Sequence, residues 1–131
     1  MNQARLKDVP FFNKLKKKEL EVIARHADEV DVPAGKVLTR QGDLGDEFFV
    51  IEAGSAEVSR DGQRVNELGP GDFFGEMALL EADRRNATVT AMTPMELIVM
   101  TRSSFRSIDT AMPHVHKTVQ EAIEQRRVPA A

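Results

Sequence analysis

The 131-residue sequence contains no cysteine and no tyrosine, and it has no long apolar run. Without cysteine the chain has no disulfide, no thiol nucleophile and no cysteine-ligated zinc site. The longest apolar runs are four residues, as in Leu97-Ile98-Val99-Met100, which is far too short to cross a bilayer. The first residues are polar and charged, unlike a signal peptide. We therefore expect a cytoplasmic protein with no membrane insertion.

Composition and charge are those of an ordinary globular chain. The sequence is 41% hydrophobic and 30% charged, with a formal net charge of −3, so it lacks the electrostatic signature of a nucleic-acid-binding protein. A basic run at Lys14, Lys16, Lys17 and Lys18 could be a nucleic-acid or membrane patch, but the net charge favours a solvated helix face. The length suits a single domain spanning residues 1–131.

The apolar pattern divides this domain into three parts. Residues 1–27 form an N-terminal helical segment, because apolar residues recur there at helical spacing: Leu15, Leu20, Val22, Ile23 and Ala27. Residues 28–101 change to period two with frequent glycine and proline, including the turn signal Gly42-Asp43-Leu44-Gly45 and the hairpin signal Asp61-Gly62. Many short strands with regular turns predict a mainly β fold, an antiparallel sandwich or barrel of about eight strands. Two helices are expected over residues 102–127.

The second of these C-terminal helices has an apolar face. Thr101 or Ser103 can cap the first helix, and Pro113 suits the first turn of the second. Val115, Val119 and Ile123 then lie on one side of it. This face predicts a surface that packs against something else.

Residues 73–88, with the sequence FFGEMALLEADRRNAT, carry the strongest chemical signal. Gly75 permits a turn and close approach of a ligand, and Glu76 begins a short helical run whose first N–H groups suit an anion. Arg85 could fold back over that helix start and complete a phosphate cradle. A carboxylate such as Glu76 accepts well from sugar hydroxyls. Phosphate and ribose held together indicate a nucleotide.

This stretch resembles the phosphate-binding cassette of cyclic nucleotide-binding domains, the type found in the cAMP receptor protein and in regulatory subunits of protein kinase A. The matching residues, at the family's nine-residue spacing from glutamate to arginine, are Phe74, Gly75, Glu76, Met77, Ala78, Leu79, Arg85, Ala87 and Thr88. One position departs from the family pattern, since Arg84 replaces the usual proline, and the spacing selects Arg85 as the inward arginine. The order of elements also matches over nearly the whole chain. The resemblance implies a jelly roll, or double-stranded β-helix, with flanking helices and a short phosphate-binding helix.

The resemblance also implies a ligand and its site. The ligand would be cAMP, with cGMP close behind, and there would be no catalytic cofactor. Arg85 would hold the cyclic phosphate and Glu76 the ribose 2′-hydroxyl, while Asn86 would influence the choice of base. The implied ligand-binding residues are Gly75, Glu76, Met77, Ala78, Arg85, Asn86, Ala87 and Thr88. The C-terminal helix would close over the base as a lid through Val115, Val119 and Ile123.

Other functional classes remain open to different degrees. No serine lies in a nucleophile-elbow context, and His114 and His116 fall on different faces of a helix, so neither an enzyme nor a metal site is expected. Glu76 and Arg85 could be only an exposed ion pair worth under about 1 kcal/mol. The chain could then be a protein-interaction domain that binds no nucleotide. It could also be the sensor fragment of a channel, kinase or transcription regulator.

The expected partners are a cyclic nucleotide and a protein effector or partner domain. The C-terminal helix is also a candidate homodimer seam. Direct DNA binding is not expected, because no basic recognition helix follows the cassette.

Overall fold

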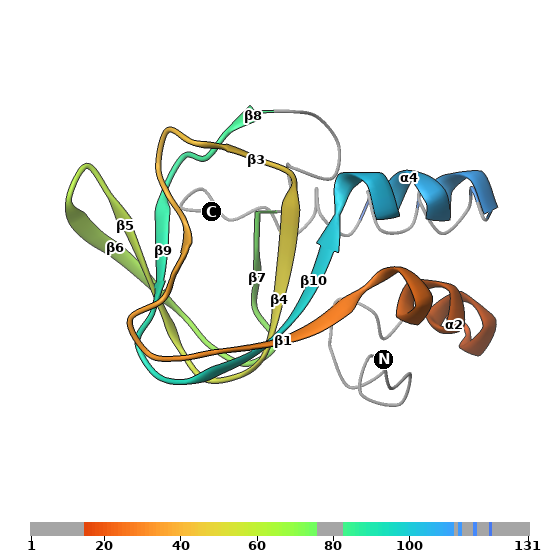
Figure 1. Cartoon of the computed structure of the whole chain (residues 1–131), viewed down its shortest axis with the longest axis horizontal. Coiled ribbons are helices and arrows are strands. Elements are labelled where there is room, and N and C mark those ends of the chain that lie inside the picture. Colours follow the sequence, from red (N-terminus) through yellow and green to blue (C-terminus); the bar gives the residue numbers. More distant parts are fainter. Residues whose placement is uncertain (1–14, 76–82, 112, 114–116, 118–120, 122–131) are drawn as a thin grey trace.

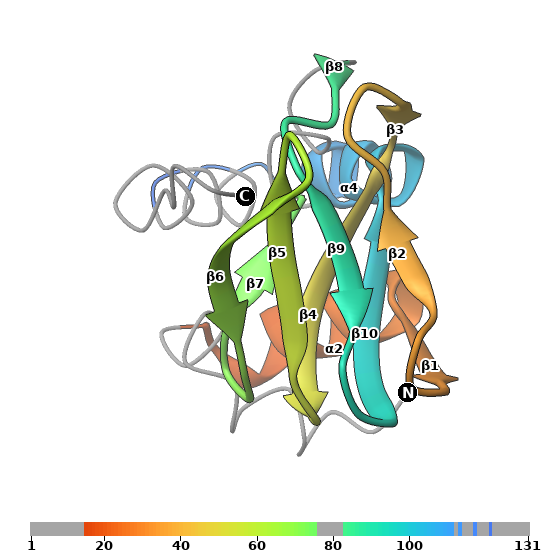
Figure 2. The ribbon, with the colours of Figure 1, turned by 90° about the vertical axis from the view of Figure 1, so that its left-hand side faces the viewer.

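The fold is a two-sheet antiparallel sandwich with helices on one side, as seen in the computed structural model (Figures 1 and 2). The structure describes residues 15–75 and 83–111, together with 113, 117 and 121. The first sheet contains, in spatial order, β1 (Asp28–Val32), β10 (Met95–Thr101), β4 (Glu47–Ala53) and β7 (Phe73–Phe74). The second contains β2 (Val37–Thr39), β9 (Thr88–Ala91), β5 (Ala56–Arg60) and β6 (Gln63–Leu68). The predicted fold class, a jelly roll with flanking helices, is confirmed.

The first sheet is the middle one of three layers, which explains the four-residue apolar runs. In β4, Phe48 and Val50 face the helices, while Phe49 and Ile51 face the second sheet. The run in β10 divides in the same way, since consecutive side chains of a strand point to opposite faces. Both strands are therefore buried on both sides. Figure 2 shows the second sheet in front, the first sheet behind it and the helices beyond.

Two helices cover the outer face of the first sheet. In α2 (Lys17–His26), the backbone N–H of Lys16 donates to the Glu19 carboxylate at 2.7 Å, which satisfies a donor at the helix start. In α4 (Arg102–Ala111), Thr101 Oγ1 accepts from the backbone N–H of Ser104 at 3.1 Å, as its predicted role as a cap requires. Ile23 of α2 and Phe105 of α4 belong to the same buried cluster. The helices are thus fixed to the sheet by a shared apolar core.

Shortening a buried side chain in this helix–sheet core should destabilise the fold modestly. Ile23 is fully buried, at 0% exposed. Ile23→Val is expected to lower the free energy of unfolding by about 0.5–1.5 kcal/mol. Val65→Ala, at a position 48% exposed on β6, is the control and should change it by less than about 0.5 kcal/mol. Urea unfolding measures both, and equal losses would contradict this placement of the core.

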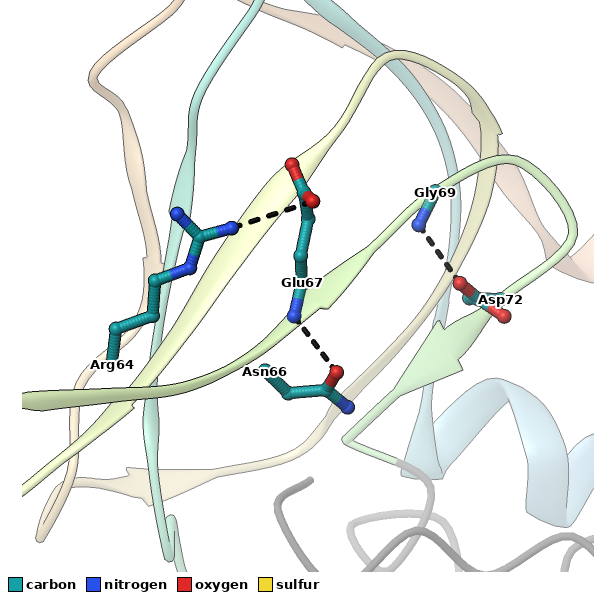
Figure 3. A network of polar contacts seen from close by, with 5 residues as sticks. All are labelled: Arg64, Asn66, Glu67, Gly69 and Asp72. Carbon is teal, nitrogen blue, oxygen red and sulfur yellow. Dashed lines mark hydrogen bonds and ion pairs between the residues drawn. The ribbon is translucent and has the colours of Figure 1, made fainter.

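The chain enters residues 73–75 from a tightly bonded turn. The Asp72 carboxylate accepts from the Gly69 N–H at 2.8 Å (Figure 3). The Ile51 N–H donates to the Asp72 carbonyl at 2.9 Å, so the turn is attached to β4. Phe73 then packs edge-on against Phe48, with ring centroids 5.7 Å apart, and Phe74 stacks on Phe49 at 4.7 Å. These contacts fix the position of the backbone just before Gly75.

The structure adds one feature that the strand pattern does not predict. The glycines at positions 42 and 45 predict a turn, whereas Leu44–Gly45 form a short strand, β3, that pairs with β8 (Asp83–Arg84) in a separate two-stranded ribbon. The ribbon has no apolar alternation because it lies at the edge of the molecule, where β3 pairs with β8 alone among the described strands. Leu44 is 68% exposed there. Figure 1 shows the ribbon at the top of the fold, above β4 and β9.

Candidate functional site

The β3–β8 ribbon brings two segments about forty residues apart in sequence into direct contact. Leu44 lies opposite Arg84, and Gly45 lies opposite Asp83. Just beyond the ribbon, the Gly42 N–H donates to the Arg85 carbonyl at 2.8 Å, and the Arg85 N–H donates to the Asp43 carbonyl at 2.7 Å. The backbone of Arg85 is therefore held on both its donor and its acceptor side.

The two consecutive arginines have different environments. Arg84 is exposed, and its guanidinium donates to the Gly42 carbonyl at 2.8 Å. Arg85 is half-buried, and its Nη2 donates to the carbonyl oxygen of Glu47, the first residue of β4, at 2.8 Å. The ribbon thus directs the side chain of Arg85 toward β4 and the start of the cassette.

Two glycines make room for the Arg85 guanidinium. A Cβ atom on Gly45 would overlap the guanidinium, and one on Gly75 would come within 2.7 Å of both Arg85 Nη1 and the Glu47 carbonyl oxygen. Gly75 also has a φ of +76°, which side chains rarely adopt. The guanidinium is therefore enclosed between glycine backbone on two sides. A planar guanidinium bordered by backbone in this way suits a phosphate, which it can bind through two parallel N–H donors.

The segment after Arg85 is fixed by groups from other strands. The Asn86 carbonyl accepts from Arg60 Nε at 3.0 Å, and the Asn86 side chain is exposed. Ala87 is 3% exposed within the sandwich core, where a larger side chain would not fit without rearrangement. Thr88 Oγ1 accepts from the Gln41 N–H at 3.0 Å. Four of the predicted ligand-binding residues, 85 to 88, thus form one ordered run beside Gly75.

The remaining predicted site residues lie outside the described part of the chain. These are Glu76, Met77 and Ala78 of the cassette and Val115, Val119 and Ile123 of the predicted lid. Their roles stay predictions. Pro113, Lys117 and Glu121, which are described, have helical backbone and exposed side chains.

Sequence reasoning missed two contributors to the site. The turn signal predicts no role in the site for Gly45, although its lack of a side chain is what admits the Arg85 guanidinium. A glycine within a strand often marks such a close approach, and that signal was available. The other contributor is the main-chain carbonyl of Glu47, and no sequence pattern can identify a main-chain acceptor.

A second polar feature adjoins the site. An open hollow of about 420 Å³ is lined, among the described residues, by Asp46, Arg102, Ser103, Arg106, Ser107 and Thr110. The Asp46 carbonyl accepts from the Arg102 N–H at 2.9 Å. The carbonyl of residue 46 thus bonds the start of α4, and the carbonyl of residue 47 bonds the Arg85 guanidinium. These two consecutive main-chain carbonyls connect α4 with the site.

The described residues show neither a metal centre nor a membrane-spanning helix. Within residues 15–75, 83–111 and the three isolated positions, no three histidine, cysteine or acidic side chains are grouped to hold a metal ion. No helix in the same residues is long and apolar enough to cross a membrane.

The chain is similar to known proteins over most of its length. The sequence model of the cyclic nucleotide-binding domain matches residues 29–110. A cyclic nucleotide-gated potassium channel of Rhizobium etli is 39% identical over 119 residues, covering 91% of this chain and 33% of the channel. The cAMP-dependent protein kinase regulatory subunit of Schizosaccharomyces pombe is 39% identical over 104 residues, covering 79% of this chain and 25% of the subunit.

A solved structure gives the same result. The regulatory domain of Toxoplasma gondii PKA, crystallised with cAMP, superposes with a TM-score of 0.78 at 28% identity. The match covers 94% of this chain and 48% of that one. The chain therefore belongs to the cyclic nucleotide-binding domain family, as its cassette predicts. It spans about a third of the channel and a quarter of the kinase subunit.

Proposed function

We propose that this chain is a regulatory module that binds cAMP, or cGMP, in the cassette of residues 73–88. The observation that carries the proposal is the Arg85 guanidinium enclosed between Gly45 and Gly75, where it can hold the cyclic phosphate. Glu76 accepts from the ribose 2′-hydroxyl, and Gly75, Met77, Ala78, Asn86, Ala87 and Thr88 complete the site. The chain performs no catalysis and needs no cofactor besides this ligand.

Binding is proposed to act through the C-terminal helices. The phosphate binds to the cassette through Arg85, and the helix carrying Val115, Val119 and Ile123 closes over the base. A switch of this kind transmits about 1–3 kcal/mol of coupling between sites. The response is passed to an effector or partner domain in the cytoplasm, consistent with similarity to a channel and a kinase subunit that are much longer than this chain.

Equilibrium titration tests the binding itself. Calorimetry of the purified chain with cAMP and with cGMP should show saturable binding at micromolar concentrations, and linear 5′-AMP at the same concentrations should bind far more weakly. The ratio of the two cyclic nucleotide affinities reports the influence of Asn86 on base choice. No heat with either cyclic nucleotide would favour the second candidate, a protein-interaction domain that keeps the fold without the ligand.

A change at Glu76 should have a smaller effect than one at Arg85. In Glu76→Gln the amide oxygen still accepts from the ribose hydroxyl, while the stronger charge-assisted bond is lost. We expect affinity for cAMP to fall by about five- to tenfold, corresponding to the roughly 1 kcal/mol difference between charged and neutral hydrogen bonds. The same variant should not change the affinity for 2′-deoxy-cAMP, which lacks that hydroxyl. An equal loss for both ligands would contradict the assigned role.

A further inference from the structure

A reciprocal hydrogen-bonded pair joins two loops next to the cassette. Gln41 Nε2 donates to Asp61 Oδ1 at 2.8 Å, and the Asp61 N–H donates to Gln41 Oε1, also at 2.8 Å. Gln41 lies in the loop between β2 and β3, and Asp61 lies in the tight turn between β5 and β6. Asp61 has a φ of 54°, which aspartate and asparagine tolerate better than most residues. The pair therefore ties the β2–β3 loop to the tip of the β5–β6 hairpin.

Both of these elements also hold the cassette. The Arg85 carbonyl accepts from the Gly42 N–H at 2.8 Å. The Asn86 carbonyl accepts from Arg60 Nε at 3.0 Å, and the Ala87 carbonyl accepts from Thr39 Oγ1 at 3.2 Å. The Gln41 N–H donates to Thr88 Oγ1. Three consecutive carbonyls of the cassette are thus bonded to residues that lie within two positions of Gln41 or Asp61 in the sequence.

These bonds also set the direction of the cassette N–H groups. In a trans peptide the carbonyl of one residue and the N–H of the next point to opposite sides, and no cis peptide occurs in the described residues. Holding the Arg85 carbonyl fixes the direction of the Asn86 N–H, and holding the Asn86 carbonyl fixes that of the Ala87 N–H. Both N–H groups are therefore oriented before any ligand arrives, which lowers the ordering cost of binding.

We propose that Arg60 and the Gln41–Asp61 pair are positioning residues that preorganise the Asn86 and Ala87 amides for the ligand phosphate. The inference rests on the proposed nucleotide-binding function and adds residues outside the cassette to it. Gln41 and Asp61 are exposed, so their pair contributes little to overall stability. Their effect falls on ligand affinity, because the segment that they restrain is the one that meets the phosphate.

A swapped pair tests this role separately from folding. Gln41→Glu removes the donor to Asp61 and places two carboxylates together, and it should lower cAMP affinity by about tenfold. Asp61→Asn keeps the acceptor oxygen and tolerates positive φ, so its affinity should stay within about twofold of wild type. In the double variant Asn at position 61 donates to Glu at position 41, the bond is restored in reverse, and affinity should return to within about threefold of wild type.

Arg60 has a matched control on the same hairpin. Arg60→Met keeps the apolar stem but removes the donor to the Asn86 carbonyl, and it should lower cAMP affinity by about five- to tenfold. Arg64 instead bonds Glu67 at 3.3 Å across the surface of β6 (Figure 3). Arg64→Met should therefore leave the affinity within about twofold of wild type.

Calorimetric affinities and melting temperatures of the ligand-free variants decide the outcome. Weaker binding by Gln41→Glu with an unchanged melting temperature, restored in the double variant, supports the positioning role. If wild type binds cAMP and Arg85→Ala does not, but Gln41→Glu and Arg60→Met bind like wild type, the positioning role is wrong and the proposed function stands. The positioning role is also wrong if the variants that bind cAMP more weakly have lower melting temperatures and the double variant does not restore the affinity. If wild type binds no cyclic nucleotide, both proposals fail.

Discussion

Replacing Arg85 by alanine is expected to weaken cyclic nucleotide binding by roughly 2–5 kcal/mol, or about one and a half to three and a half orders of magnitude in Kd. The ligand phosphate would then lose its charge-assisted bonds to the guanidinium that lies between Gly45 and Gly75. Leaving a bound charge without its partner costs far more than losing an exposed ion pair. Calorimetry with cAMP measures the loss directly.

The neighbouring arginine provides the control. Arg84 precedes Arg85 in the sequence, but its side chain is exposed and donates to the Gly42 carbonyl. Arg84→Ala should keep the cAMP affinity within about threefold of wild type, as expected of a surface charge. Wild-type affinity in Arg85→Ala, or an equal loss in both variants, would show that the assigned phosphate site is wrong.

A methyl group at Gly45 is expected to produce the second largest loss, without any change at a ligand-contacting residue. The Cβ of Gly45→Ala would occupy the space of the Arg85 guanidinium. The guanidinium is the end of a flexible side chain, and the φ of Gly45 lies outside the left-handed region, so the side chain moves and the backbone does not. We expect cAMP affinity to fall by at least about tenfold, since a displaced guanidinium loses its paired bonds to phosphate.

Gly69 is the matched glycine for this substitution. It also has an ordinary φ, and a Cβ there would meet nothing within 4 Å. Gly69→Ala should therefore bind cAMP like wild type, and the melting temperatures of both ligand-free variants should stay close to that of wild type. If Gly45→Ala binds cAMP as tightly as Gly69→Ala, the Arg85 guanidinium can bind the phosphate without lying against Gly45. The proposed geometry of the site would then be wrong.

The sequence predicts most of the sandwich because its signals are local. The four-residue apolar runs come from strands buried on both faces, and the Asp61-Gly62 turn joins β5 to β6 as expected. The glutamate-to-arginine spacing of the cassette that this stretch resembles selects Arg85 over Arg84, and the structure places the Arg85 guanidinium toward β4. These features depend on residue type and interval, which a single sequence contains.

The β3–β8 ribbon and the loop contacts could not be predicted in the same way. A two-residue strand is too short for periodicity to appear, so Leu44–Gly45 cannot be told from a turn. The pairs Gln41–Asp61 and Arg60–Asn86 join residues 20 and 26 positions apart, and their contact depends on how the hairpin folds over the cassette. Only the assembled sheets bring those groups together.

The most direct measurement is a crystal structure of this chain with cAMP bound. We expect the Arg85 guanidinium to stay between Gly45 and Gly75, and the oxygens of the cyclic phosphate to lie within hydrogen-bonding distance of that guanidinium and of the Ala87 N–H. A nucleotide bound elsewhere on the fold, or a phosphate with no contact to Arg85, would contradict it.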